Sequence, residues 1–510
     1  MRVFLSVLLF AIISTNSLFS QSKQDYNWFF SIDRNSQQEG IQGLRFDFND
    51  AYLMPKTADQ GLSFDHNNAS ISDRDGNLLF YTNGCAVADR EHHIMPNGDS
   101  INAGEFFDRF WGGDCKNGYP GRQDITILPD PAYEDGYYIL HKTQEYDPTA
   151  ENRFFMQYLK YTYVDLALNG GLGDVTEKNV PFAESVYQAS YFTSIAHSNG
   201  IDWWIIQPKL TENIFYTYLL SQDGFALIDS TILGDNDFAL NTSAGGDAKF
   251  SPDGTKYAFY NMTNGLWVYD FDRTTGEFSN FKSLYIEEPT SPTFASAEFS
   301  PNSRFVYLSN TDSLFQVDLW EDDLEDGKIL IDTYDGVQDP FSTSFFLSTL
   351  APDCKIYIRP GSASNIMHVI NKPNEKGLDC NFVERGLRLP QASSTGGYPN
   401  FPRWRVDEAE VCDPTLTSVF GDQVYYRRDM TVYPNPVRDV VTVDIPEGKR
   451  GRIVVFDMMG QLVWEGTEDE YRGDVLIDLS GLSVGSYSVE FLPKDNKDRL
   501  VYTSQVIKVE

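Results

Sequence analysis

A tight turn followed by a run of aromatic and β-branched residues recurs along most of the chain. Each copy opens with Asp-Gly, Asn-Gly or a related pair, and the second turn residues are Gly76, Gly136, Gly200, Gly254, Ser303 and Cys354. Such pairs supply the positive φ of a tight turn, and the apolar run after them is typical of a buried strand. The intervals of 49 to 64 residues between copies can each hold four strands, which is the size of a propeller blade.

The three late copies share one further pattern, in which an apolar strand ends, Pro fixes φ and a turn residue reverses the chain. After the first of these copies, residues 265–271 predict the next strand and residues 278–285 the outermost strand of the same unit. Strand-like pieces at 28–30, 44–48 and 400–404 predict that the two ends of the domain close the ring together. The expected fold is an all-β propeller over residues 21–410, with seven blades favoured and six or eight as alternatives.

The first twenty residues have the features of an export signal. Arg2 precedes an apolar run over residues 3–13, and Ser20 offers a small residue at the cleavage position. This run is too short for a permanent membrane anchor, and no later segment approaches the required length. We therefore expect a signal peptide over residues 1–20 and a mature protein without a transmembrane segment.

The charge balance narrows the choice of partners. The chain of 510 residues has 40 Lys and Arg against 74 Asp and Glu, a formal net charge of −34. A polyanion of this size repels phosphate backbones, so nucleic acid is not an expected partner. A surface of this sign can hold calcium or simply keep an exported protein in solution.

Five cysteines in an exported chain predict disulfide bonds, with one cysteine left over. The pairs closest in sequence are Cys85 with Cys115 and Cys354 with Cys380. We expect both pairs to be bonded, with free buried thiols as the alternative. Cys412 follows the large domain and has no evident partner. The spacings do not match those of a zinc site, so no metal site is expected.

The large domain resembles a group of secreted WD40-like propeller proteins from Bacteroidetes. The residues that carry this resemblance are 27–30, 69–72, 76–84, 168–175, 197–200 and 397–402, among them the stretches Asn27-Trp28-Phe29-Phe30 and Gly397-Tyr398-Pro399-Asn400. The resemblance implies a fold and an exported location, and it implies no particular reaction.

The pattern of the chain changes after Asp413. A linker over residues 411–428 is expected, and residues 429–510 then alternate short apolar strands with turns, as in a small antiparallel sandwich. This module is similar to the type A C-terminal sorting domain of the type IX secretion system, and a carbohydrate-binding or fibronectin-like sandwich is the alternative. The matching motif residues are Tyr433, Pro434, Asn435, Pro436, Gly460, Gly485 and Tyr487. The similarity implies handling by the type IX machinery and a sortase, and then either attachment to surface lipopolysaccharide or release.

Candidate chemistry is sparse. The motifs HExxH, G-x-S-x-G and the P-loop do not occur, and the Asp and Glu residues are too many to select a catalytic pair. Residues 73–77 superficially resemble a calcium loop, but position twelve of that loop would be Val87, so a hairpin turn is the preferred interpretation. His92 and His93 are expected on a strand, where adjacent side chains point to opposite faces.

A cluster of four aromatic residues offers a candidate binding surface. Phe106, Phe107, Phe110 and Trp111 fall in a segment between predicted strands, and exposed rings on a propeller loop stack on sugars or peptides. The alternative is a loop that folds over a blade and buries these rings. We expect a surface or secreted module that binds a glycan or a protein. The rival function is a polysaccharide- or lactone-acting hydrolase or lyase with carboxylates in the channel, and the sequence does not decide between them.

Overall fold

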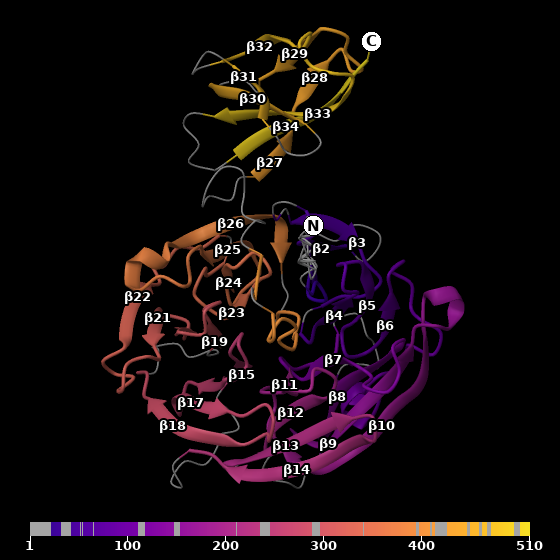
Figure 1. The fold of residues 1–510 in the computed structure, drawn as a ribbon, viewed down its shortest axis with the longest axis vertical. Coiled ribbons are helices and arrows are strands. Elements are labelled where there is room, and N and C mark those ends of the chain that lie inside the picture. Colours follow the sequence, from indigo (N-terminus) through magenta and orange to yellow (C-terminus); the bar gives the residue numbers. More distant parts are fainter. Residues whose placement is uncertain are drawn as a thin grey trace, which may run out of the picture.

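The computed structural model describes residues 22–31, 42–50, 53, 55–64, 66–110, 118–146, 154–210, 212–234, 245–287, 296–339, 341–393, 397–408, 411–413, 426–445, 449–457, 462–466, 471–493 and 500–509. Nearly all regular structure in these residues is β-strand, and the large domain is a ring of small antiparallel sheets around a centre (Figure 1). The predicted all-β propeller followed by a small sandwich is therefore confirmed as a fold class. The number of blades stays a prediction.

Sheets 1 to 7 of the large domain are named here in chain order. Sheet 1 holds β1 (Asn27–Ser31), β2 (Gln42–Asp47) and β3 (Lys56–Asp59), and sheet 2 holds β4 (Ala69–Ser72), β5 (Leu78–Thr82) and β6 (Val87–Asp89). Sheet 3 holds β7 (Ile125–Pro129), β8 (Gly136–Tyr146), β9 (Phe154–Asp165) and β10 (Asp174–Tyr187). Sheet 4 holds β11 (Thr193–Ala196), β12 (Trp203–Pro208), β13 (Ile214–Ser221) and β14 (Gly224–Ile232). Sheet 5 holds β15 (Gly246–Phe250), β16 (Lys256–Asn261), β17 (Gly265–Phe271) and β18 (Phe278–Leu284). Sheet 6 holds β19 (Ser296–Phe299), β20 (Phe305–Ser309), β21 (Ser313–Asp318) and β22 (Lys328–Thr333), and sheet 7 holds β23 (Leu347–Leu350), β24 (Ile356–Arg359), β25 (Ser364–Ile370) and β26 (Phe382–Ser393).

The recurring turns lie between the first and second strands of sheets 2 to 7, as the sequence predicts. Five of the six second turn residues have a left-handed backbone, with φ of 90° at Gly76, 72° at Gly200, 69° at Gly254, 59° at Ser303 and 64° at Cys354. The sixth, Gly136, opens strand β8 instead. The strands after these turns are largely buried, because each lies within a sheet whose two faces pack against neighbouring sheets.

The two ends of the large domain meet and close the ring. Trp28 of β1 packs against Tyr398 and Phe401, with ring centroids 5.8 Å and 6.4 Å apart. The same cluster includes buried residues of sheet 7, so the first and last sheets share one core. Residues 397–402 form no ladder with β1, and the C-terminal segment enters the middle of the ring instead (Figure 1).

One predicted disulfide is wrong. Cys354 is bonded to Cys412, with 5.2 Å between their Cα atoms, and Cys380 is a buried thiol outside that bond. The bond ties the β23–β24 turn to the end of the C-terminal segment, where the Asp413 amide also donates to the Pro352 carbonyl at 2.7 Å. Sequence spacing favoured Cys380, but the chain places it in the sheet 6–sheet 7 core. Cys85 is buried and Cys115 lies outside the described residues, so that pair stays a prediction.

The C-terminal module is a two-sheet sandwich with its own core. One sheet orders β27 (Tyr426–Asp429), β34 (Leu500–Lys508), β33 (Gly485–Pro493), β30 (Gly451–Asp457) and β31 (Leu462–Glu465). The other orders β28 (Thr431–Tyr433), β29 (Val440–Asp444) and β32 (Asp474–Asp478). The sheets differ from the expected purely antiparallel pattern at β27, which pairs in parallel with β34. Cys412 is disulfide-bonded to the ring, and residues 426–429 form a strand of the sandwich. Both ends of the predicted linker therefore belong to folded units.

Replacement of Cys412 by Ser should destabilise the large domain. The bond closes a loop with a sequence separation of 58, for which chain entropy gives about 4 kcal/mol as an upper figure. Denaturant unfolding of the wild type and C412S under oxidising conditions measures this loss. Peptide mapping without reduction should find the Cys354–Cys412 bridge in the wild type and in C380S. A Cys354–Cys380 bridge in the wild type would contradict the structure.

Candidate binding site at the mouth of the central channel

The inner strands of the ring expose alternate residues to a central channel. In β15, Ala248 and Phe250 enter a hydrophobic core, so Asp247 and Lys249 have the opposite orientation. In β19, Ala297 and Phe299 enter the next core, and Ser296 and Glu298 have the opposite orientation. Successive side chains of a strand point to opposite faces. The residues that alternate with the core residues therefore line the channel with polar side chains.

Residues 397–406 run through this channel, and we call them the plug. An open cavity remains between the plug and inner strands β11, β15 and β23. Asn400 anchors the plug near the starts of the inner strands, because its side chain donates to the carbonyls of Ile125 at 3.0 Å and Phe192 at 2.9 Å. Its backbone amide donates to Asn68 O at 3.0 Å. Further along, Arg403 Nε donates to the Phe250 carbonyl at 2.9 Å. The plug thus bonds to carbonyls from several sheets at once.

The plug also neutralises a carboxylate of the channel wall. Glu298 has no exposed side-chain surface and forms an ion pair with Arg403. Next to that arginine, Trp404 packs edge-on against Trp203, with 5.4 Å between ring centroids. Glu298 Oε1 accepts from Arg403 and from the Phe299 amide, whereas Glu298 Oε2 is buried with no hydrogen-bond partner among the described residues.

One mouth of the channel keeps a small open cavity of about 30 Å³. It lies where the inner strands begin, and the plug forms its floor through Tyr398, Pro399 and Asn400. Two basic residues belong to its lining, Arg122 from the segment before β7 and Lys249 from β15, and Lys249 also lines the cavity between the plug and the inner strands. The full lining is Arg122, Gln123, Asp247, Lys249, Leu347, Ser348, Gly397, Tyr398, Pro399 and Asn400.

A chain of hydrogen bonds fixes the acidic side of this cavity. Asp247 accepts from the Ser296 hydroxyl at 2.7 Å and from the Ala297 amide at 2.8 Å. The Ser296 hydroxyl is in turn 3.0 Å from that of Ser348, so three neighbouring sheets are linked. Burial raises the pKa of Asp247 to about 6, against the opposing effect of Lys249.

A third basic residue lies behind the mouth. Arg359 ends strand β24 and is 4% exposed. Burial lowers its pKa to about 10, Tyr398 opposes that change, and the like charge of Arg122 adds to it. Arg122 itself lies over the Phe346 ring, 4.9 Å from the centroid, and burial lowers its pKa as well. The mouth therefore gathers positive charge in an otherwise acidic chain.

The prediction of an exposed aromatic surface is wrong for two of its four residues. Residues Glu105–Phe110 form a short helix, α1, instead of a loop. Phe106 and Phe107 are buried against Tyr119 and Cys85, so these two rings face a small core and cannot stack on a ligand in this structure. The side chain of Phe110 and all of Trp111 lie outside the described residues, and their binding role stays a prediction.

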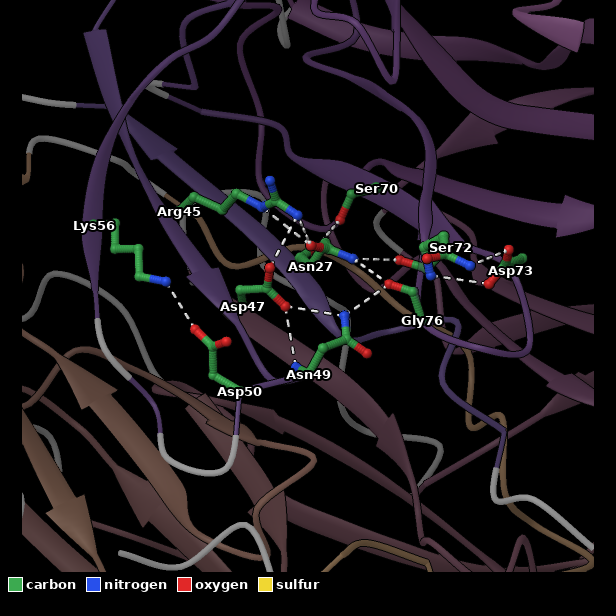
Figure 2. A network of polar contacts seen from close by, with 11 residues as sticks. Asn27, Arg45, Asp47, Asn49, Asp50, Lys56, Ser70, Ser72, Asp73 and Gly76 are labelled. Carbon is green, nitrogen blue, oxygen red and sulfur yellow. Dashed lines mark hydrogen bonds and ion pairs between the residues drawn. The ribbon is translucent and has the colours of Figure 1, made fainter. Parts of the chain in front are cut away.

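The turn at residues 73–77 is part of a structural network between sheets 1 and 2 (Figure 2). The Asp73 carboxylate accepts the amides of Asp75 and Asn77, each at 2.9 Å, as expected for a hairpin turn. Beside it, the Asn27 side chain donates to Ser72 Oγ at 2.8 Å and to Gly76 O at 2.9 Å (Figure 2). Within the described residues no group of three His, Cys, Asp or Glu is placed to hold a metal ion.

The histidines differ from one another in their surroundings. His92 and His93 lie in a turn and not on a strand, and His92 has φ of 67°. The Tyr81 hydroxyl is 3.0 Å from His92 Nδ1, and burial lowers the pKa of that imidazole. His368 is fully buried, with Nε2 2.8 Å from the Thr343 carbonyl, which agrees with a core role.

One residue of the predicted sorting motif, Asn435, forms hydrogen bonds with the last strand of the sandwich. The Asn435 side chain donates to the Gln505 carbonyl at 2.7 Å and accepts from the Ile507 amide at 2.9 Å. The Tyr487 hydroxyl donates to the Ser483 carbonyl at 2.6 Å. Tyr433 is exposed, Gly485 begins β33, and Gly460 lies outside the described residues.

Residues 431–508 match the family described as the secretion system C-terminal sorting domain. A search of curated proteins finds no match to this chain. Solved structures with a similar chain path include a periplasmic gluconolactonase of Pseudomonas aeruginosa, at 12% identity and a TM-score of 0.36, covering 89% of this chain and 98% of that one. They also include hydrazine synthase of Kuenenia stuttgartiensis, at 10% identity and a TM-score of 0.39, covering 69% and 93%. A third is the β-propeller domain of Swd1 from Myceliophteria thermophila, at 9% identity and a TM-score of 0.31, covering 62% and 86%.

The sorting domain defines the class of this protein. It is an exported propeller protein whose C-terminal module indicates secretion or attachment at the cell surface through the type IX pathway. In the part of the chain that the structure describes, no helix has the length and apolar character needed to cross a membrane.

The Asp247→Asn variant should gain stability relative to the wild type as pH rises. The folded-state pKa of Asp247 is raised from 3.8 to about 6, so the folded wild type binds a proton that the unfolded chain has lost. Wild-type stability therefore falls between about pH 4 and pH 6, and a shift of this size corresponds to roughly 3 kcal/mol at most. The charged groups that face this carboxyl are Lys249 and Glu298.

Denaturant unfolding of both proteins at pH 4, 5, 6 and 7 measures this difference. Asp272 is the matched control, because the Thr274 amide lowers the pKa of that exposed carboxyl, so Asp272→Asn should shift the pH dependence in the opposite sense. Parallel pH profiles for the wild type and D247N would contradict the assignment.

Proposed function

We propose that this protein is an exported, non-enzymatic propeller that binds a glycan or protein component at the cell surface or in the medium. The observation that carries the proposal is the plug, which occupies the channel that a central active site would use. Its anchor, Asn400, bonds to two inner-strand carbonyls, and its Arg403 pairs with the buried Glu298. Ligands are therefore expected at the mouth or on the loops around it.

The rival function is hydrolysis or lyase chemistry by channel carboxylates. Such chemistry needs an acid and a base that both reach one substrate bond. Glu298 is ion-paired with Arg403, and Asp25 is ion-paired with Arg405. Asp247 lines the mouth, but both of its oxygens already accept hydrogen bonds from sheet 6. These contacts favour binding over turnover.

Delivery rests on the C-terminal domain. We propose that type IX machinery exports the chain, and that a sortase then removes residues 429–510 and joins the propeller to surface lipopolysaccharide or releases it. The separate core of the sandwich supports this division, since the module buries its own apolar residues. A folded signal of this kind can be recognised and cut off without opening the ring.

Deletion of residues 429–510 should retain the protein in the periplasm, because export across the outer membrane would lose its signal. Cell fractionation and surface protease accessibility measure the outcome. As the matched control, the same residues fused to a periplasmic reporter should carry that reporter to the surface or medium. Surface exposure of the truncated protein would show that the sorting assignment is wrong.

The purified protein should bind glycan or protein components without converting them. A glycan array and a panel of polysaccharide and lactone substrates, run on the same preparation, test both properties. Phe110→Ala or Trp111→Ala should weaken binding if these rings contact the ligand, while Phe281→Ala on the outer strand β18 is the control. Turnover that is lost in Asp247→Asn or Glu298→Gln would replace the proposal with the rival enzyme.

A further inference from the structure

The mouth of the channel concentrates basic residues from three separate parts of the chain. Arg122 precedes β7, Lys249 lies in β15 and Arg359 ends β24, and the first two line the same cavity. The chain as a whole has 40 Lys and Arg against 74 Asp and Glu, so a local excess of positive charge runs against its composition. An arrangement of this kind attracts negatively charged ligands.

Three cations of the ring, buried or largely buried, are paired with carboxylates. Lys142 lies 2.6 Å from Asp124, Arg403 pairs with Glu298, and Arg405 lies 2.6 Å from Asp25. By contrast, among the described residues no carboxylate lies within ion-pair distance of Lys249 or Arg359. Lys249 and Arg359 at the mouth therefore lack a carboxylate partner in this part of the chain, as does the buried Lys355 next to the β23–β24 turn.

Leaving such cations half-buried or buried is costly for the folded protein. Removing a charge from water without a compensating partner is unfavourable. Arg359 is 4% exposed, and burial lowers its pKa to about 10. Asp247 is the acidic group in the cavity lining, and its oxygens are held by Ser296 and Ala297. A bound anion would supply the missing compensation.

The size of the cavity limits what that anion can be. A space of about 30 Å³, closed below by the plug, suits one small charged end group and not a chain that passes through. Arg and Lys together favour planar or tetrahedral oxyanions, which accept several charge-assisted hydrogen bonds. The side walls formed by Leu347 and Pro399 add apolar contact beside the charged groups.

We propose that the mouth of the channel binds the carboxylate or sulfate group of an acidic sugar residue, held by Lys249 and Arg122 with Arg359 behind them. This inference rests on the proposed binding function and names its ligand class. The positive charge selects acidic over neutral sugars, and the plug restricts entry to a terminal or side-group residue. Peptides with an acidic end are the competing ligand class.

Calorimetric titration of the full protein with sodium glucuronate and with sodium sulfate tests this proposal. Binding of at least one probe is expected, and glucose at the same concentration should not bind. Lys249→Gln and Arg122→Gln should each weaken that binding tenfold or more, since a charge-assisted contact in a partly buried site is worth at least about 1.4 kcal/mol. Asp247→Asn should tighten it, because a nearby negative charge is removed.

Lys256→Gln is the matched control. It lies on the adjacent strand β16, makes the same change in net charge, and is already paired with Asp270 at 2.7 Å, so the affinity for the probes should stay at the wild-type value. Thermal unfolding of each variant verifies that the ring is folded. If Lys249→Gln does not fold, the direction of the Asp247→Asn change decides.

The outcomes separate this inference from the proposed function. Absence of binding by both probes, or equal loss in Lys256→Gln and Lys249→Gln, would overturn the oxyanion site even where the glycan array shows binding elsewhere. Preference for acidic peptides over glucuronate and sulfate would overturn the sugar assignment. Turnover of an array ligand would overturn the proposed function instead.

Discussion

The ring depends on the contact between its two ends. The Arg405 guanidinium binds both carboxylate oxygens of Asp25, at 2.6 Å and 2.7 Å, and also donates to the carbonyls of Ser22 and Val411. Removing such an ion pair from water is unfavourable. Loss of only one partner, however, lowers the free energy of unfolding by about 3–5 kcal/mol, because the other charge is then buried without a partner. Every other sheet is held between two neighbours, whereas sheets 1 and 7 meet only if the ends of the domain are brought together.

The same closure explains where the fold could be predicted from sequence. Turn residues such as Gly76 and Gly254 report a local backbone requirement, φ greater than zero, and the apolar run after each turn reports burial. Both signals are local, so six turn–strand units and the outer strands near residues 265–285 agree with the structure. The pairing of Cys354 is a property of the closed ring, and sequence distance misled the choice of its partner.

The candidate site was harder to predict for a physical reason. Arg122, Arg359 and the β15 pair Asp247 and Lys249 come from three places in the sequence and converge only through the circular order of the sheets. A partial signal was present, because Asp247 and Lys249 alternate with apolar residues in a strand that is otherwise buried. The aromatic cluster at Phe106 and Phe107 was the stronger sequence signal, yet these rings complete a small core with Tyr119. Aromatic density alone does not distinguish a binding surface from a local core.

The plug links stability to function in one segment. Asn400, Arg403 and Arg405 hold it to carbonyls and carboxylates around the ring, and the Cys354–Cys412 bond fixes its far end. Chemistry by Glu298 or Asp25 would have to displace the two arginines of the plug that neutralise these acids. A ligand at the mouth needs no such change, because the plug forms the floor of that cavity. The C-terminal segment of the large domain therefore forms the floor of a small cavity whose lining includes Arg122 and Lys249, on a protein that is acidic as a whole.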